Sequence, residues 1–349
     1  MGGTSSSVME IQLDRHPAPY CAGELIKGTL FIQVDSSFSS KGLEYDIGVR
    51  LSGQEFTSAM SRDADVSHTS TEKFSIVAVE QVLTTLNSQS LISPQIELPF
   101  SIEVPPGLPG SQGIREKHHD HFCIEYFLQA VATRSGSTKK DFVTETRVNL
   151  SGPVYTGPKT PSAEEAAAVP IAVSIFCGCV PTGHIYVGLN TDNTNPSLGE
   201  TIKVEFSVKN ESSSTIKAVE IKLSEALDFV ADGVAGHRKR CLVRHRIEAS
   251  ELDSASLVKS SQAAYQTISK DAAGPRKQVD ITVPSSARHS YVGRLGKVRH
   301  YLSIKVVTKA LVKNAISVLP ITIHSDGRSV DAGEVQEIES LQIEMDEDA

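Results

Sequence analysis

The sequence predicts an all-β protein of two tandem immunoglobulin-like β-sandwich domains, and three observations support this prediction. Apolar residues recur at every second position in many short runs, as is typical of half-buried strands. Segments rich in Gly, Pro, Ser and Asp separate these runs, as in a sandwich. One motif also returns 176 positions later (199 minus 23), since Gly23-Glu24-x-Ile26-Lys27 is matched by Gly199-Glu200-x-Ile202-Lys203.

Further matches follow in the same order in both halves, which distinguishes a duplicated domain from the chance recurrence of one motif. The chain of 349 residues is also longer than one hydrophobic core usually organises. We therefore expect two copies of one all-β unit. The other matching segments are Ile47-x-Val49-Arg50-Leu51-Ser52 with Val219-x-Ile221-Lys222-Leu223-Ser224, Ile102-x-Val104-Pro105 with Ile281-x-Val283-Pro284, and Tyr126-Phe127-Leu128 with Tyr301-Leu302.

Breaks in the alternation give the expected boundaries. Prolines in Pro105-Pro106-Gly107-Leu108-Pro109 cannot continue a ladder, because proline has no amide donor. A Gly- and Pro-rich linker separates the domains, and in it Ser162 and Glu165 form the capping box of two helical turns. The expected parts are a disordered leader at 1–7, an N-domain at 8–152, a linker at 153–167, a C-domain at 168–325 and an acidic tail at 326–349.

The alternation predicts fifteen strands. In the N-domain they lie near residues 8–13, 24–34, 43–53, 73–86, 96–104, 121–133 and 141–150. In the C-domain they lie near residues 171–176, 184–190, 200–210, 215–227, 238–248, 277–283, 298–309 and 316–323. Residues 249–265 are expected to form a loop or a short helix.

Composition restricts the class of protein. No run reaches the ~18 apolar residues of a membrane span, and the N-terminus lacks the features of a signal peptide, so we expect a cytoplasmic protein. The start Met1-Gly2-Gly3-Thr4-Ser5-Ser6 fits either N-myristoylation at Gly2 or a plain disordered leader. The five cysteines predict reduced thiols, and the net charge of −8 argues against nonspecific nucleic-acid binding.

An ordered set of motifs in both halves resembles the arrestin family, over roughly residues 8–325. The C-domain is most similar to that of the arrestin-domain-containing, or alpha-arrestin, group. The N-domain motifs are Tyr20-x-x-Gly23-Glu24-x-x-x-Gly28, Leu98-Pro99-Phe100 and Ile124-x-Tyr126-x-Leu128-x-Ala130. The C-domain motifs are Phe176-Cys177-Gly178-Cys179, Gly199-Glu200, Val208-x-Asn210-x-Ser212 and Leu319-Pro320-Ile321-x-Ile323.

The resemblance implies two sandwiches joined by a short hinge and a non-enzymatic adaptor without a cofactor. Such proteins bind cytoplasmic segments of membrane receptors or transporters, together with trafficking or ubiquitination machinery. Alpha-arrestins recruit ubiquitin ligases through Pro-Pro-x-Tyr, but Pro105-Pro106 continues here with Gly107-Leu108. The paired basic phosphate sensor of receptor-binding arrestins is not carried over either, since the first strand has only Arg15 nearby. A retromer-type subunit, which shares the fold, is the alternative adaptor.

Two polar clusters suggest a metal-dependent enzyme as a further alternative. His118-His119-Asp120-His121 contains ligand types that zinc accepts, although only His119 and His121 would converge in an extended segment. Cys177-Gly178-Cys179 has one residue too few between its thiols for the usual metal or redox pair. A solvated loop is the simpler interpretation of the His118–His121 cluster, and a structural role is the simpler interpretation of the two cysteines.

The densest positive charge is His237-Arg238-Lys239-Arg240-Cys241-Leu242-Val243-Arg244-His245-Arg246. In a regular strand Arg238, Arg240, Arg244 and Arg246 share one face. Because the planar guanidinium suits phosphate, we expect this run, with Lys239, to bind anionic lipid headgroups such as phosphoinositides or a phosphorylated partner. The alternative is a solvated edge strand protected by its charge.

The tail at 326–349 holds nine acidic residues against Arg328 alone. Leu341-x-Ile343-x-Met345 keeps a strand-like alternation, so the tail is either a solvated extension or a segment that docks. Receptor-binding arrestins hold a docked C-tail, and the resemblance implies the same arrangement here. The expected acceptors are Arg288, His289, Arg294, Lys297, Arg299 and the Arg238–Arg246 run.

Overall fold

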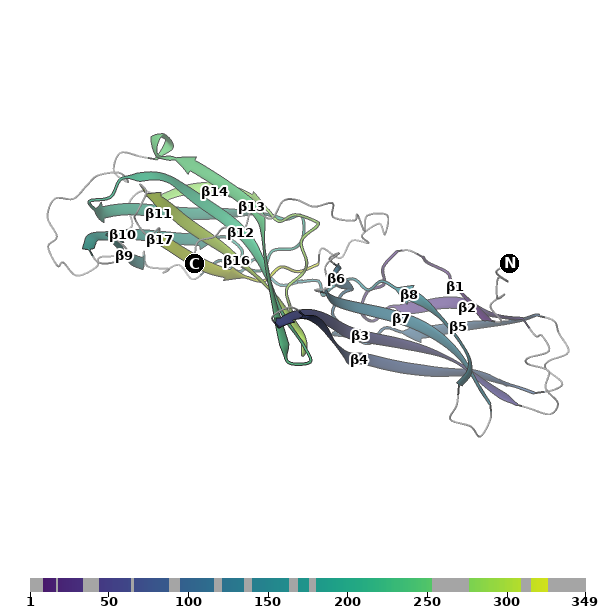
Figure 1. Ribbon diagram of the computed structural model, residues 1–349. Helices are drawn as coiled ribbons and strands as arrows, with labels where there is room; N and C mark the ends of the chain where they lie inside the picture. The colour runs from purple at the N-terminus through teal and green to yellow at the C-terminus, as the bar shows by residue number, and fades with distance from the viewer. Residues whose placement is uncertain are drawn as a thin grey trace, which may run out of the picture.

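The computed structural model describes residues 9–16, 18–33, 44–63, 66–87, 95–115, 121–134, 140–162, 169–175, 180–252, 276–308 and 315–325. These residues form strands and their connections, with a 3-10 turn at Ala249–Glu251. The strands build two sandwich-like bodies that lie end to end (Figure 1). Within these ranges no helix has the length and apolarity needed to cross a bilayer. The predicted pair of β-sandwiches is confirmed.

The N-domain packs a three-stranded antiparallel sheet, ordered β1-β2-β5, against a five-stranded sheet. The larger sheet has the order β4-β3-β7-β6, and β8 also pairs with β7. The strands are β1 (Met9–Leu13), β2 (Leu25–Gln33), β3 (Tyr45–Asp63), β4 (Val66–Leu86), β5 (Gln95–Glu103), β6 (Gln112–Arg115), β7 (His121–Arg134) and β8 (Lys140–Val148).

The C-domain repeats the two-sheet plan with a four-stranded sheet, β14-β11-β10-β9, and a five-stranded sheet, β13-β12-β16-β15 with β17 on β16. Its strands are β9 (Val169–Ile175), β10 (Val180–Thr191), β11 (Thr201–Ser212), β12 (Ile216–Ala231), β13 (Val234–Glu248), β14 (Arg276–Thr282), β15 (Tyr291–Val292), β16 (Gly296–Thr308) and β17 (Ala315–Ile321). All fifteen predicted strands are present with shifted ends, whereas β6 and β15 were not predicted.

The duplicated motif forms the same turn twice. Gly23 and Gly199 have φ angles of 81° and 76°, a conformation that glycine adopts without strain. The carboxylate of the following glutamate accepts a hydrogen bond from the amide three residues before it, at 2.8 Å for Glu24 and 3.0 Å for Glu200. The sequence repeat therefore corresponds to an identical local structure in both domains.

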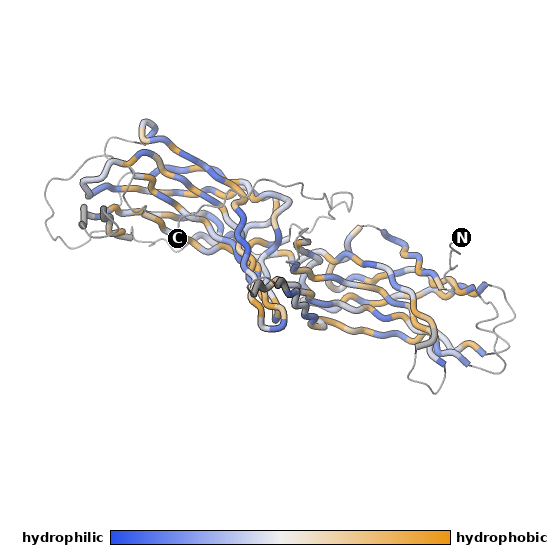
Figure 2. Tube along the Cα trace, in the orientation of Figure 1, coloured by the Kyte–Doolittle hydropathy of each residue, from blue (hydrophilic) through white to orange (hydrophobic). Residues whose placement is uncertain are grey.

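Hydrophobic and polar residues alternate along the strands, so that one face of each sheet is buried. Figure 2 shows this alternation as orange and blue along the strands.

One hairpin, however, crosses between the domains. The β12–β13 hairpin turns at Asp232-Gly233, where both φ angles are positive, as a tight two-residue loop requires. Near its tip, Leu227, Phe229 and Ala231 are buried in the N-domain core. The hairpin thus joins the two domains in addition to the covalent linker.

The same contact explains why β3 reaches Asp63 and β4 begins at Val66, both within the gap between the predicted strands 43–53 and 73–86. This stretch is rich in Ser, Thr and Asp, yet Thr57 is buried and its hydroxyl donates a 2.7 Å hydrogen bond to the carbonyl of Val230 in the hairpin. The packing of the C-domain outweighs the weak strand propensity of the segment.

The linker lies along the C-domain. The ring of Tyr155 stacks on His324 at 4.9 Å, and the ammonium of Lys159 pairs with Glu200 at 2.9 Å. The hydroxyl of Ser162 accepts a 2.9 Å hydrogen bond from the amide of Thr191. The expected helical turns at 163–168 lie outside the described residues.

Candidate anion-binding face and the domain junction

Strand β13 carries the basic run at one edge of the five-stranded sheet, next to β12 (Figure 1). The register slips by one residue between Leu223 and Ser224 of β12, and this leaves Leu242 of β13 without a partner on β12. An extra residue of this kind is a β-bulge, and the side chains beyond it point to the opposite face. The bulge therefore divides the basic run.

The prediction that four arginines share one face is wrong for this reason. Arg244 and Arg246 lie on the outer face, where Arg246 Nη1 contacts Glu220 Oε1 at 2.8 Å. Arg238 and Arg240 lie on the inner face, opposite Leu227 and Glu225 of β12. Lys239, expected on the other face from the arginines, shares the outer face with Arg244 and Arg246.

The outer face continues across the neighbouring strands. Lys222 of β12 lies opposite Arg244, and Lys305 of β16 lies opposite Glu220. Lys239 lies in line with Arg299 across β12, with its ammonium 5.1 Å from the centre of the Tyr301 ring. We call this surface the outer basic face; its cations are Lys222, Lys239, Arg244, Arg246, Lys297, Arg299 and Lys305.

The acidic groups of this face neutralise only part of its charge. Burial alone would raise the pKa of Glu220, but the hydrogen bond from Arg246 and the charges of Lys222 and Arg244 outweigh it and lower the pKa. Glu220 is therefore ionised at neutral pH. Seven cations and the three carboxylates Glu220, Asp228 and Glu248 leave a net charge of +4 on the outer basic face.

An apolar border adjoins the cations. On β17, Ile316 is 53% exposed and Val318 is 55% exposed, and these residues lie opposite Lys305 and Ser303 of β16. Sequence reasoning missed this border and also Lys222 and Lys305, although their alternation in the predicted strands 215–227 and 298–309 placed them on the polar faces. An apolar strip beside cations suits an interfacial surface.

One of the two inner arginines of the run, Arg240, belongs to a buried cluster. Glu225 is 2% exposed and pairs with Arg240, Arg288 and His300. Burial would raise its pKa, but the hydrogen bond from His300 and the charges of both arginines lower the pKa to about 2. His300 also contacts the Ser290 hydroxyl at 2.9 Å and is itself buried. The cluster is a structural network, although the buried Arg240 Nε has no hydrogen-bond partner among the described residues.

A second buried carboxylate joins the domains. Glu55 of β3 is 2% exposed and accepts hydrogen bonds from β15 of the C-domain and from the turn that follows it. The donors are the backbone amides of Leu295 at 2.6 Å and Arg294 at 3.1 Å, together with the Tyr291 hydroxyl. At Gly296 a Cβ would lie 2.2 Å from the Phe122 ring, so glycine allows this close approach.

The expected tail-docking residues lie in three settings. The Arg288 side chain is 11% exposed, and its guanidinium binds both Glu225 and the carbonyl of Gly113 in the N-domain. Arg294 stacks over Phe74, 4.9 Å from the ring centre. Lys297 and Arg299 are exposed on the outer basic face. The tail itself, residues 326–349, lies outside the described residues.

The proposed metal ligands are mostly outside the described residues as well, namely His118–Asp120 and Cys177–Cys179. His121 begins β7, paired with Ser58 of β3. In the described part of the chain, no group of three or more His, Cys, Asp or Glu side chains is arranged to hold a metal ion.

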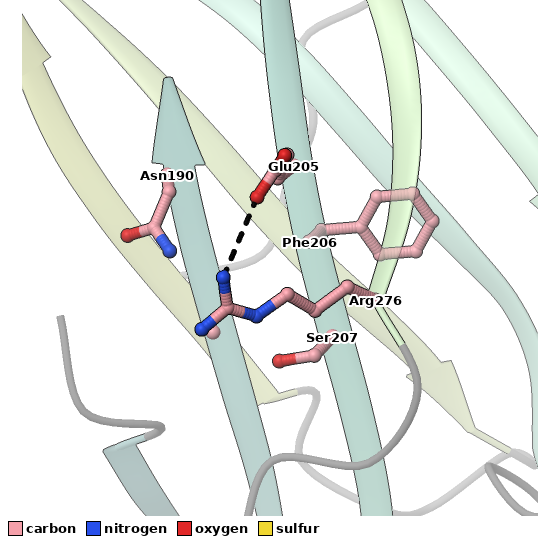
Figure 3. A pocket seen from close by; sticks show the side chains of 6 residues that line it. Asn190, Glu205, Phe206, Ser207 and Arg276 are labelled. Carbon is pink, nitrogen blue, oxygen red and sulfur yellow. Dashed lines mark ion pairs between the residues drawn. The ribbon is translucent and has the colours of Figure 1, made fainter. Parts of the chain in front are cut away.

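A shallow, open hollow lies on the outer side of the four-stranded sheet (Figure 3). Gly188 has no side chain to fill this hollow, and Arg276 crosses it to pair with Glu205 at 3.7 Å. The lining side chains are Asn190, Glu205, Phe206, Ser207 and Arg276. Both members of the ion pair are exposed, so the hollow is an open surface feature.

The comparison with protein families identifies the second sandwich. The model for the arrestin (or S-antigen) C-terminal domain matches residues 181–326. Together with the all-β architecture, this match supports membership of the arrestin family. Proteins of this family are typically non-enzymatic adaptors, so the arrestin domain indicates an adaptor or scaffold of the arrestin type. The comparison with curated proteins found no match.

Proposed function

We propose that this protein is a non-enzymatic adaptor that binds cytoplasmic segments of membrane receptors or transporters and connects them to trafficking machinery. Its place of action would be the cytoplasmic side of the plasma membrane or of endosomes. The outer basic face would hold the C-domain against anionic headgroups, including phosphoinositides. This orientation leaves the N-domain and the junction available for protein partners.

The outer basic face is the observation that supports this proposal most. The chain as a whole has a net charge of −8, yet this one sheet face carries +4. A positive surface on an acidic protein favours one orientation at an anionic membrane, since each cation near such a surface contributes about 1 kcal/mol. The exposed Ile316 and Val318 border would contact the headgroup region.

Proximity labelling with the full-length chain in living cells tests the adaptor function. We expect receptors or transporters and trafficking or ubiquitination components among the labelled proteins. An Arg244→Gln, Arg246→Gln, Lys305→Gln variant should label fewer membrane proteins than the wild type. Labelling of endosomal coat subunits alone would favour the retromer-type alternative, and labelling with no membrane proteins would contradict the proposal.

A further inference from the structure

His289 is a buried ionisable residue at the junction of the two domains. Its side chain belongs to the C-domain segment before β15, and the residue is 6% exposed. The ring lies against the backbone of Gly110 and Gly152 on the N-domain side. A Cβ at Gly110 would lie 2.8 Å from its Cε1, and a Cβ at Gly152 would lie 2.9 Å from its Nδ1. The closed junction therefore covers the imidazole.

The surroundings of His289 do not accommodate a proton. Its buried Nε2 has no hydrogen-bond partner among the described residues. His300 on β16 and His324 after β17 face it, and a positive charge on either opposes one on His289. The carboxylate of Glu225 on β12 is engaged by Arg288 and His300. Burial and the two neighbouring histidines lower the pKa of His289 to about 4.

We propose that the domain junction is acid-sensitive, because His289 can take up a proton readily only when the N-domain moves away from it. Opening exposes the ring to water and allows it to titrate as an ordinary histidine. Acidification therefore shifts the molecule from the closed junction toward an open one. An adaptor that reaches an acidified environment would loosen its two domains there.

The sign and size of the effect follow from linkage. His289 has a lower pKa in the closed form than in the open form. The free-energy preference for the closed form is therefore complete above about pH 6.5 and is lost as the pH falls from there toward 4. If His289 has a pKa of 6.5 in the open form, the equilibrium constant for opening rises about 30-fold at pH 5, relative to pH 7.5.

Hydrogen exchange on the full chain at pH 7.5 and pH 5.0, corrected for the intrinsic exchange rates, measures this opening. The reporter is the amide of Leu295, which is bound to Glu55 across the junction, and the reference is the core amide of Leu223. We expect protection at Leu295 to fall about 30-fold more in the wild type than in His289→Asn. His245→Asn, at an exposed position on β13, should behave as the wild type.

Two further measurements separate this effect from damage to the fold. His289→Phe removes the ionisable group while filling the site, and its junction should also lose the acid response. Titration of the imidazole by NMR, assigned by difference with His289→Asn, should give a midpoint well below 6.5. Equal acid responses in the wild type and both variants, or a midpoint near 6.5, would overturn the proposal.

Discussion

The backbone amide of Leu295 in the C-domain donates a 2.6 Å hydrogen bond to the carboxylate of Glu55 in the N-domain. Glu55 is 2% exposed, and the other donors, the amide of Arg294 and the hydroxyl of Tyr291, come from the same β15–β16 hairpin. A buried carboxylate held by neutral donors requires all of them, since each lost partner leaves part of its charge unsolvated. The two domains are thus coupled through one side chain.

Replacing Glu55 should therefore destabilise the junction. We expect Glu55→Ala to lower the free energy of unfolding by about 2–4 kcal/mol, because the buried amide of Leu295 and the partly buried amide of Arg294 lose their acceptor. Chemical denaturation monitored by circular dichroism measures this loss. Glu97→Ala, at an exposed position on β5, should change stability by less than about 0.5 kcal/mol. Similar effects of both substitutions would contradict the coupling role of Glu55.

The bulge at Leu242 predicts different effects for two nearby arginines. Arg240→Gln should lower stability by about 1–2 kcal/mol, because Arg240 contacts the buried Glu225 at 3.3 Å. Arg244→Gln should leave stability unchanged but weaken binding to anionic vesicles, since Arg244 lies on the outer face. Thermal unfolding and vesicle cosedimentation of the two variants separate these effects. If the two variants had the same unfolding temperature and the same affinity for vesicles, both side chains would lie on one face.

The Glu225 cluster predicts a loss of stability in acid. Because the pKa of Glu225 is lowered to about 2 in the folded state, its contribution is complete above about pH 4.5 and is lost as the pH falls toward 2. The contribution amounts to about 3 kcal/mol. Denaturation at a series of pH values should show Glu225→Gln less stable than the wild type at pH 7, with a gap that closes in acid. A difference in stability that did not change with pH would contradict a lowered pKa for Glu225 in the folded state.

The strands and the duplicated turn could be predicted because both depend on local pattern. Period-2 alternation located the strands, and Gly23-Glu24 with Gly199-Glu200 marked the repeat. The continuation of β3 past residue 53 could not be predicted, because contacts 173 residues away in sequence, such as Thr57 with Val230, stabilise it. The two-residue strand β15 is likewise too short to leave a periodic signal.

The candidate site was predicted in part. The run Arg238–Arg246 directed attention to the correct strand, but the bulge at Leu242 depends on pairing with β12 and leaves no mark in the period of β13. Lys222 and Lys305 join the site only through strand register. The junction groups Glu55 and His289 are isolated in sequence, and only the packing of one domain on the other makes them buried.

The acidic tail leads to a prediction about regulation. If residues 326–349 dock on cations such as Lys297 and Arg299, deleting residues 330–349 should strengthen binding to anionic vesicles by about 1–3 kcal/mol, a typical coupling free energy. Cosedimentation of the full-length and truncated chains at the same salt concentration tests this. Unchanged affinity, with tail amides unprotected from hydrogen exchange, would identify the tail as a solvated extension.

The outer basic face has a matched control on the other sheet of the same domain. Lys203, Lys209 and Arg276 are cations on the outer side of the four-stranded sheet, and Lys209 and Arg276 pair with neighbouring glutamates, as Arg246 does. Neutralising these three residues changes the net charge by the same amount as neutralising Arg244, Arg246 and Lys305. A difference between the two triple variants therefore reports position and not total charge.

The most direct test of the account is the affinity of both triple variants for phosphoinositide-containing vesicles at physiological salt. With about 1 kcal/mol for each cation, Arg244→Gln, Arg246→Gln, Lys305→Gln should weaken binding roughly 100-fold relative to the wild type. Lys203→Gln, Lys209→Gln, Arg276→Gln should bind within a few-fold of the wild type. Equal affinities for the wild type and both variants would contradict a membrane-binding role for the outer basic face.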